Sequence, residues 1–136
     1  MQNPPPVQAS KSSTGLDENV AALLSYIFGW VSGLIFFLIE KDSRLVRFHA
    51  MQSILFNALI AVVGIVLWIV TVVVLLVGTQ LPGIMGGLLS LISTLFWLVF
   101  SVGLLIAFIL CLVKAFQGQY WKLPVVGNFA EKFSTK

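Results

Sequence analysis

Two long uncharged stretches dominate the pattern of polar and apolar positions along this chain. The first runs from Asn19 to Ile39 and has 21 residues, and the second runs from Phe48 to Val113 and has 66. At about 1.5 Å per residue, 21 residues just cover a hydrocarbon core of roughly 30 Å, which predicts one transmembrane helix. The second stretch would make a continuous helix of about 99 Å, so it must fold back.

The fold-back is predicted at residues 78–83, Gly-Thr-Gln-Leu-Pro-Gly, where the only proline of the second stretch stands between two glycines. The predicted spans are therefore about 19–39, 53–77 and 86–113. A backbone in lipid must satisfy its own hydrogen bonds, and the sequence lacks the alternating pattern of membrane strands. We therefore expect an all-α integral membrane protein with three transmembrane helices.

The segments outside the spans complete the predicted organisation. Residues 1–15 include Pro4-Pro5-Pro6 and one charge, which predicts a disordered polar tail. Residues 16–113 form the predicted transmembrane domain, and residues 114–136 a cytoplasmic tail with a short interfacial segment. No cleaved signal peptide is expected, because the first apolar run is a full-length span.

Composition and charge fix the class of protein and an orientation. Of 136 residues, 59% are hydrophobic and 10% charged, against about 25% charged in ordinary soluble domains, so a soluble fold is excluded. With an external N-terminus, seven Lys and Arg residues fall on the inner side and only Lys11 outside. The sequence therefore predicts an external N-terminus, a cytoplasmic C-terminus and a cytoplasmic turn at residues 40–43, in a multi-pass protein of the plasma membrane.

The residues needed for most chemistries are missing from this sequence. A single cysteine excludes a zinc site built from several cysteines, and a single histidine excludes a multi-histidine cluster within one chain. No phosphate-binding loop, nucleophile elbow or metalloprotease motif occurs. Only His49 with Glu40 or Asp42 could serve an enzyme acting on lipids. We expect no enzyme activity, no metal and no cofactor. The net charge of +3 fits anionic lipid better than nucleic acid, because the basic residues flank the spans.

Small residues recur at a spacing of four and predict helix contacts. Ser25, Gly29 and Gly33 form one such ridge, and Gly103 and Ala107 belong to another. The favoured interpretation is packing among the chain's own helices, and the alternative is contact between copies. A credible interfacial anchor follows the third span and comprises Lys114, Tyr120, Trp121 and Lys122.

A polar stripe begins the second predicted helix. At 100° per residue, His49, Ser53 and Asn57 lie within roughly 80°, with Gln52 on the other side of His49. Arg47 precedes them, and Arg44 and Arg47 could reach lipid headgroups or pair with Glu40 and Asp42. The favoured interpretation is that the stripe hydrogen-bonds neighbouring helices; the alternative is a polar entrance at the cytoplasmic side.

Three strings carry a resemblance to a known family: TGLDENVAALLSYIFGWVSGLIFFLIEK (14–41), VRFHAMQSILF (46–56) and VKAFQGQYWKLPVVGNFAEK (113–132). They resemble a family of small uncharacterised prokaryotic membrane proteins that is distantly similar to the Tic-twenty component of plastid protein import. The resemblance implies a compact helical membrane domain without known enzyme activity, and it carries no functional residue across to this chain.

The sequence thus predicts a non-enzymatic membrane protein that acts through helix association, as a homo-oligomer or as a small subunit of a larger assembly. The alternative is a Tic-twenty-like conduit, in which several copies arrange the polar stripe around a path for polypeptide or small solutes.

Overall fold

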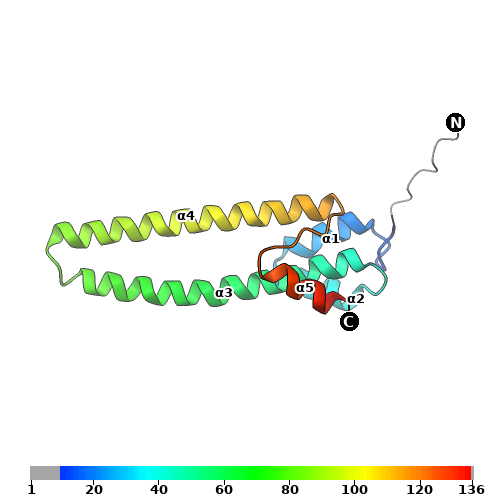
Figure 1. The fold of residues 1–136 in the computed structure, drawn as a ribbon, viewed down its shortest axis with the longest axis horizontal. Coiled ribbons are helices and arrows are strands. Elements are labelled where there is room, and N and C mark those ends of the chain that lie inside the picture. The colour runs from blue at the N-terminus through cyan, green and yellow to red at the C-terminus, as the bar shows by residue number, and fades with distance from the viewer. Residues whose placement is uncertain (1–9, 136) are drawn as a thin grey trace, which may run out of the picture. The chain divides into compact units, whose positions relative to one another are not determined.

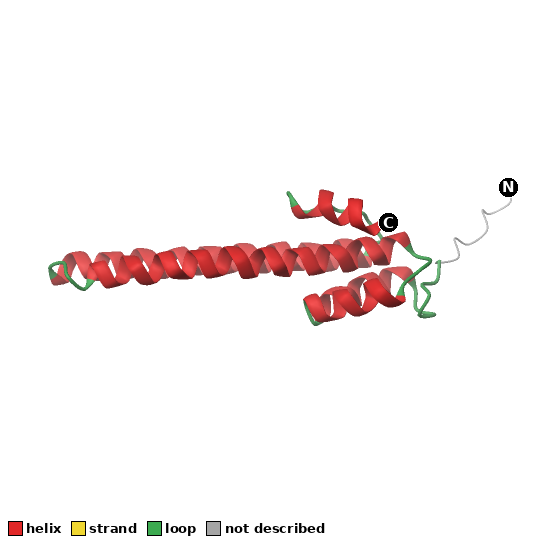
Figure 2. Ribbon diagram, turned by 90° about the horizontal axis from the view of Figure 1, so that it is seen from below, coloured by secondary structure: helices red, strands yellow, loops and turns green. Residues whose placement is uncertain are grey.

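The computed structural model describes residues 10–135 as α-helices joined by short connections (Figures 1 and 2). The helices are α1 (Glu18–Ile27), α2 (Trp30–Ile39), α3 (Arg44–Gly78), α4 (Gly83–Phe116) and α5 (Val126–Ser134). The all-α prediction is confirmed for these residues. The chain divides into two compact units: the second unit holds Ala58–Leu110, and the first holds the residues before and after that segment.

The first apolar stretch is broken in the middle. Helix α1 ends at Ile27 and α2 begins at Trp30, and Gly29 between them has a φ of 59°, which a side-chain-bearing residue adopts only with strain. Ser32 bridges the break, because its Oγ accepts a bond from Phe28 N–H at 3.1 Å and lies 3.0 Å from the Ser25 carbonyl oxygen to which it donates. The continuous helix predicted over 19–39 is therefore wrong: α1 and α2 form a helical hairpin.

The two ends of this hairpin lie together. Ser13, before α1, donates from its backbone N–H and its hydroxyl to the carboxylate of Glu40, directly after α2, and from its hydroxyl to Asp42. Residues in such contact lie on the same side of a membrane. The predicted orientation, which puts residues 10–17 outside and residues 40–43 in the cytoplasm, is not supported by this contact.

The predicted polar tail over 1–15 falls partly outside the described residues, which begin at 10. Residues 10–17 form a compact turn instead of an extended tail. Lys11 and Asp17 face each other in an isolated antiparallel bridge, and the Ser12 N–H donates to the Leu16 carbonyl oxygen at 2.8 Å. The turn places Ser13 against the end of α2.

Helices α3 and α4 are the two helices within residues 10–135 that are long and apolar enough to cross a membrane. They have 35 and 34 residues, so each extends beyond the spans of 53–77 and 86–113 that the sequence predicts. They are joined by the predicted fold-back, and in the second unit they run side by side in opposite directions (Figure 1). There, Trp97 Nε1 donates to the Thr71 hydroxyl at 3.1 Å, while most large apolar side chains remain exposed.

The predicted C-terminal tail, residues 114–136, contains a short amphipathic helix. Helix α5 buries Val126, Gly127 and Ala130 in the first unit and exposes Phe129 and Phe133. Its start is tight, because a Cβ on Gly127 would lie 2.6 Å from the Cα of Lys122. The first unit thus comprises α1, α2, the beginning of α3, the end of α4 and α5.

Candidate functional site

The polar residues at the beginning of α3 converge on a buried cluster in the first unit. His49 is fully buried; its Nδ1 lies 3.0 Å from the Tyr26 hydroxyl and its Nε2 lies 2.9 Å from the Gln119 carbonyl oxygen. A carbonyl oxygen only accepts, so we assign the ring proton to Nε2, and Nδ1 then accepts from the tyrosine. This chain of two bonds links α1, α3 and the segment after α4.

Gln52 completes the cluster one turn further along α3. Its side-chain amide is fully buried, and Nε2 donates to the Tyr26 hydroxyl and to the Trp121 carbonyl oxygen, both at 3.2 Å. Its Oε1 lies 3.4 Å from the Leu123 N–H, and Cys111 Sγ lies 3.9 Å from Nε2. We name Tyr26, His49, Gln52 and Cys111 the polar cluster. Every polar side-chain atom buried within residues 10–135 has a hydrogen-bond partner.

Ser53 and Asn57 lie along the hairpin break instead of in the polar cluster. The Ser53 hydroxyl donates to the Gly29 carbonyl oxygen at 3.0 Å, and Asn57 Nδ2 donates to the Ser53 carbonyl oxygen at 2.8 Å. A Cβ on Gly29 would lie 3.1 Å from Asn57 Oδ1. These residues therefore hold the turn between α1 and α2 against α3.

Arg47 joins three elements through a different set of bonds. Its Nε donates to the Ser134 carbonyl oxygen of α5 at 3.2 Å, and Nη1 donates to the Glu40 carbonyl oxygen at 3.0 Å. Its guanidinium carbon lies 4.7 Å from the centre of the Phe37 ring, within the range of a cation–π contact. The predicted pairing of Arg47 with a carboxylate is not found; backbone carbonyls and a ring are its partners.

The Glu40 carboxylate is bound by backbone N–H groups and a hydroxyl instead of by a basic side chain. It is fully buried as a residue, and it accepts from the backbone N–H groups of Ser13, Asp42 and Ser43 at 2.9–3.0 Å. Burial by itself raises the pKa of Glu40, but these bonds, together with the Ser13 hydroxyl, outweigh it and lower the pKa below its usual value. The carboxylate is therefore charged at neutral pH and organises the turn from α2 to α3.

The predicted packing residues divide between the two units. In the first unit Ser25 is buried, Gly29 forms the hairpin turn, and Gly33 meets α3 so closely that a Cβ would lie 2.9 Å from the Ala50 carbonyl oxygen. In the second unit Gly103 has no atom within 4 Å of a Cβ position, and Ala107 is half-buried. The ridge on the first stretch thus serves packing within the chain, and the α4 ridge leaves an open face.

The predicted interfacial anchor has two parts: Lys114 lies in the last turn of α4, and the other three residues follow the helix. Lys114 Nζ donates to Gln119 Oε1 at 3.0 Å, and Lys122 forms an ion pair with Glu131 of α5. Tyr120 is exposed, while Trp121 is half-buried and offers its carbonyl oxygen to the polar cluster.

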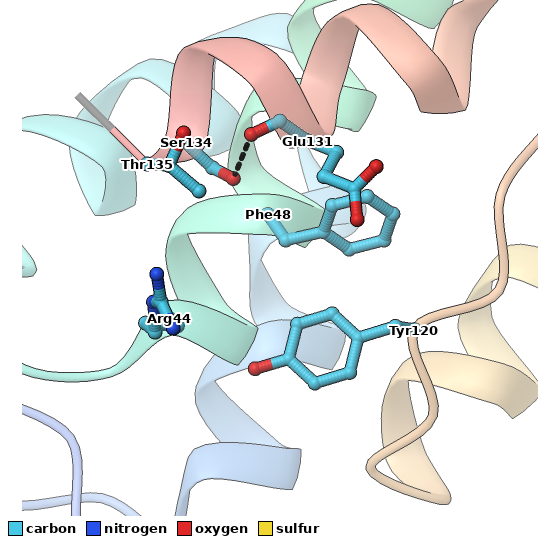
Figure 3. A pocket seen from close by; sticks show the side chains of 6 residues that line it. All are labelled: Arg44, Phe48, Tyr120, Glu131, Ser134 and Thr135. Carbon is cyan, nitrogen blue, oxygen red and sulfur yellow. Dashed lines mark hydrogen bonds between the residues drawn. The ribbon is translucent and has the colours of Figure 1, made fainter.

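An open pocket of about 330 Å³ lies beside the anchor in the first unit (Figure 3). It is lined by Arg44, Phe48, Tyr120, Glu131, Ser134 and Thr135. The Phe48 and Tyr120 rings lie 5.4 Å apart between centroids. Partial burial and the negative charge of Glu18 raise the pKa of the Tyr120 hydroxyl, and Arg44 opposes them, so the hydroxyl remains protonated at neutral pH.

Tyr26 and the backbone of residues 119–123 are the parts of this site that sequence reasoning missed. Tyr26 is the only tyrosine within the two uncharged stretches, and a buried phenol needs a hydrogen-bond partner, so a signal was present. The Gln119 and Trp121 carbonyl groups carry no such signal, because any residue supplies one. Within residues 10–135, no group of three or more His, Cys, Asp or Glu side chains is placed to hold a metal ion.

The two long apolar helices and a polar cluster whose side chains bond to one another and to the backbone are typical of a helical membrane protein. A family model described as the magnetosome magnetite crystal formation protein family matches residues 16–130, and this chain belongs to that family. A UPF0132 membrane protein of Methanocaldococcus jannaschii is 35% identical over 125 residues, which cover 91% of this chain and 94% of the relative. One of Archaeoglobus fulgidus is 38% identical over 117 residues, covering 86% and 95%.

No solved structure matches the chain at a significant level. None of these findings supports the resemblance to the Tic-twenty component. They establish a membrane protein family and leave its activity open.

Proposed function

We propose that this chain is a non-enzymatic, multi-pass protein of the plasma membrane that acts through helix association. In this proposal α3 and α4 cross the bilayer, and the exposed face of α4 around Gly103 and Ala107 contacts other membrane helices, in a homo-oligomer or in a larger assembly. The observation that carries the proposal is that no other part of the second unit covers this small-residue face of α4 at Gly103. Small residues of this kind line contacts between membrane helices.

The orientation we propose follows from two crossing helices. An even number of crossings puts the start of α3 and the end of α4 on one side. All eight Lys and Arg residues of the sequence lie before residue 48 or after residue 113, and none lies in the α3–α4 turn. With two crossings, all eight Lys and Arg residues fall on one side and none on the other, which favours a cytoplasmic first unit. This bias is stronger than the seven to one that three crossings would give.

A conduit lined by the polar stripe is the less favoured function. A pathway needs polar side chains that face water, whereas His49, Gln52 and Ser53 are buried and bonded to groups of their own unit.

The association proposal is tested by mass measurement in native lipid discs with Gly103→Leu and a matched control, Gly64→Leu. Both glycines are helical and have open space at the Cβ position, so neither change should disturb the fold. We expect the wild type to have a mass above one chain, Gly103→Leu to lower it and Gly64→Leu to leave it unchanged. A single-chain wild type without a stoichiometric partner would contradict the proposal, and an unaffected Gly103→Leu would remove this face from it.

A further inference from the structure

We propose that the α1–α2 hairpin is a re-entrant element: it enters the cytoplasmic leaflet, turns at Gly29 among the acyl chains and leaves through the same surface. The proposal rests on the proposed function in placing the first unit at the cytoplasmic side and in taking α3 as a crossing helix. The partner it commits to is the hydrocarbon of one leaflet.

The apolar surface of the hairpin is the first argument. At the turn, Phe28 is 77% exposed and Trp30 57% exposed, and α2 continues with a run of exposed large side chains. These are Val31, Leu34, Ile35, Leu38 and Ile39. No charged residue occurs between Asn19 and Ile39. A contiguous apolar surface of this kind on a monomer marks contact with another protein or with a membrane.

The backbone at the turn is the second argument, because lipid offers no hydrogen-bond partners and an irregular backbone at membrane depth must be satisfied by protein. The Phe28 N–H donates to Ser32 Oγ, the Gly29 N–H donates to the Tyr26 carbonyl oxygen, and the Gly29 carbonyl oxygen accepts from Ser53. These three backbone groups of the turn are thus satisfied by protein, as a position among acyl chains requires.

The third argument is length. Helices α1 and α2 have ten residues each, about 15 Å, which is half of a hydrocarbon core of roughly 30 Å. Acidic residues stand at both open ends of the hairpin, Asp17 and Glu18 at one and Glu40 and Asp42 at the other, and Ser13 joins the two ends. The charged ends therefore fit one headgroup layer while the turn reaches toward the bilayer centre.

Helix α3 is compatible with this depth. With Arg47 at the headgroups, the remaining helix from Phe48 to Gly78 has 31 residues and measures about 46 Å. That is close to the roughly 40–45 Å of a bilayer with its headgroup layers, and a modest tilt accommodates the excess. The glycines and hydroxyls near the α3–α4 turn would then lie in the opposite headgroup layer.

The test is cysteine labelling with a membrane-impermeant maleimide, applied to oriented vesicles that hold the full chain in a Cys111→Ala background. Single cysteines are placed by Lys11→Cys, Lys41→Cys, Phe28→Cys and Gln80→Cys, all at exposed positions. We expect Lys11→Cys and Lys41→Cys to be labelled from the cytoplasmic side, Gln80→Cys from the other side, and Phe28→Cys from neither.

The outcomes separate the two proposals. Labelling of Lys11→Cys and Lys41→Cys from opposite sides would show a straight span and overturn the re-entrant hairpin. Labelling of Phe28→Cys from the cytoplasmic side would place the turn in water and overturn it as well. Labelling of Gln80→Cys from the same side as Lys41→Cys would instead overturn the crossing of α3 and α4.

A second measurement does not depend on cysteine substitution at the turn. The fluorescence of Trp30 is obtained as the difference between the wild type and Trp30→Phe, in vesicles whose lipids carry bromine at a shallow or a deep acyl position. We expect stronger quenching by the deep bromine. Stronger quenching by the shallow bromine, or none, would overturn the proposed depth.

Discussion

The hydroxyl of Ser53 donates a hydrogen bond to the carbonyl oxygen of Gly29 at 3.0 Å. This bond ties the turn between α1 and α2 to the side of α3, and the same carbonyl oxygen also accepts from the Gly33 N–H at 3.2 Å. The Asn57 side chain lies against the same glycine. The hairpin is therefore shaped by α3 as much as by its own sequence, and changes at Gly29 should affect the whole first unit.

Replacing Gly29 by alanine is expected to destabilise the first unit. At a φ of 59° and ψ of −132° a Cβ is strained, at a cost of about 1–3 kcal/mol, and the new methyl group would also lie 3.1 Å from Asn57 Oδ1. The measurement is thermal unfolding in detergent. Gly103→Ala is the matched control: its site is helical and open, so that variant should be unchanged or slightly more stable. Equal melting temperatures for the two variants would contradict this reading of the turn.

Gln52→Leu is expected to loosen the segment that follows α4. Leucine fills similar space but leaves the Trp121 carbonyl oxygen and the Leu123 N–H without the amide, and a buried group left unpaired costs about 1–3 kcal/mol. Limited proteolysis of the purified protein should then cut within residues 117–125 faster than in the wild type.

The control for this change is Gln80→Leu, at an exposed position in the α3–α4 turn. It makes the same glutamine-to-leucine change at a position outside the polar cluster, so cleavage after α4 should stay at the wild-type rate. An unchanged cleavage rate in Gln52→Leu would mean that the amide bonds do not hold the segment.

The long apolar segments were predictable because their signal is local. The fold-back at 78–83 and the helical character of α3 and α4 follow from charge gaps and from Gly and Pro alone. That the polar side chains of the stripe need hydrogen-bond partners was also predictable, because an unpaired polar group is costly in an apolar environment. In the structure His49, Gln52 and Ser53 bond to backbone carbonyl groups of the first unit.

The break at Gly29 was not predictable by the same means. Ser25, Gly29 and Gly33 at a spacing of four are equally consistent with one packed helix and with a hairpin, and length favoured the single span. Tertiary contacts decide between the two. Ser53 and Asn57 of α3 pack against the turn at Gly29, and Ser13 bonds to Glu40 at the open end of the hairpin. The contact between the 10–17 and 40–43 segments depends on that break, so it was not predictable either.

Arg47→Lys is expected to release the end of α5. A lysine keeps the charge but has a single nitrogen, so it cannot bond to the Ser134 and Glu40 carbonyl groups in the two directions that Nε and Nη1 provide. Hydrogen exchange of residues 126–134 should become faster. Arg44→Lys, at an exposed neighbouring position with no such bonds in residues 10–135, should leave the exchange of α5 unchanged; equal acceleration in both variants would contradict a specific role for Arg47.

Acid should weaken the contact between residues 10–17 and the end of α2 through Glu40. The pKa of Glu40 is lower in the folded state than in the unfolded chain, so its contribution to stability is present above the ordinary glutamate pKa of about 4.3 and is lost as the pH falls through the folded-state value. Glu40→Gln keeps the shape but removes the charge from the bonds with the Ser13, Asp42 and Ser43 N–H groups, and should lower stability at pH 7.

Because other acids titrate in both the wild type and Glu40→Gln, the informative quantity is the difference between their melting temperatures. We expect it to be large at pH 7 and to shrink below about pH 4, whereas a difference that stays constant with pH would show that the charge of Glu40 does not hold the turn.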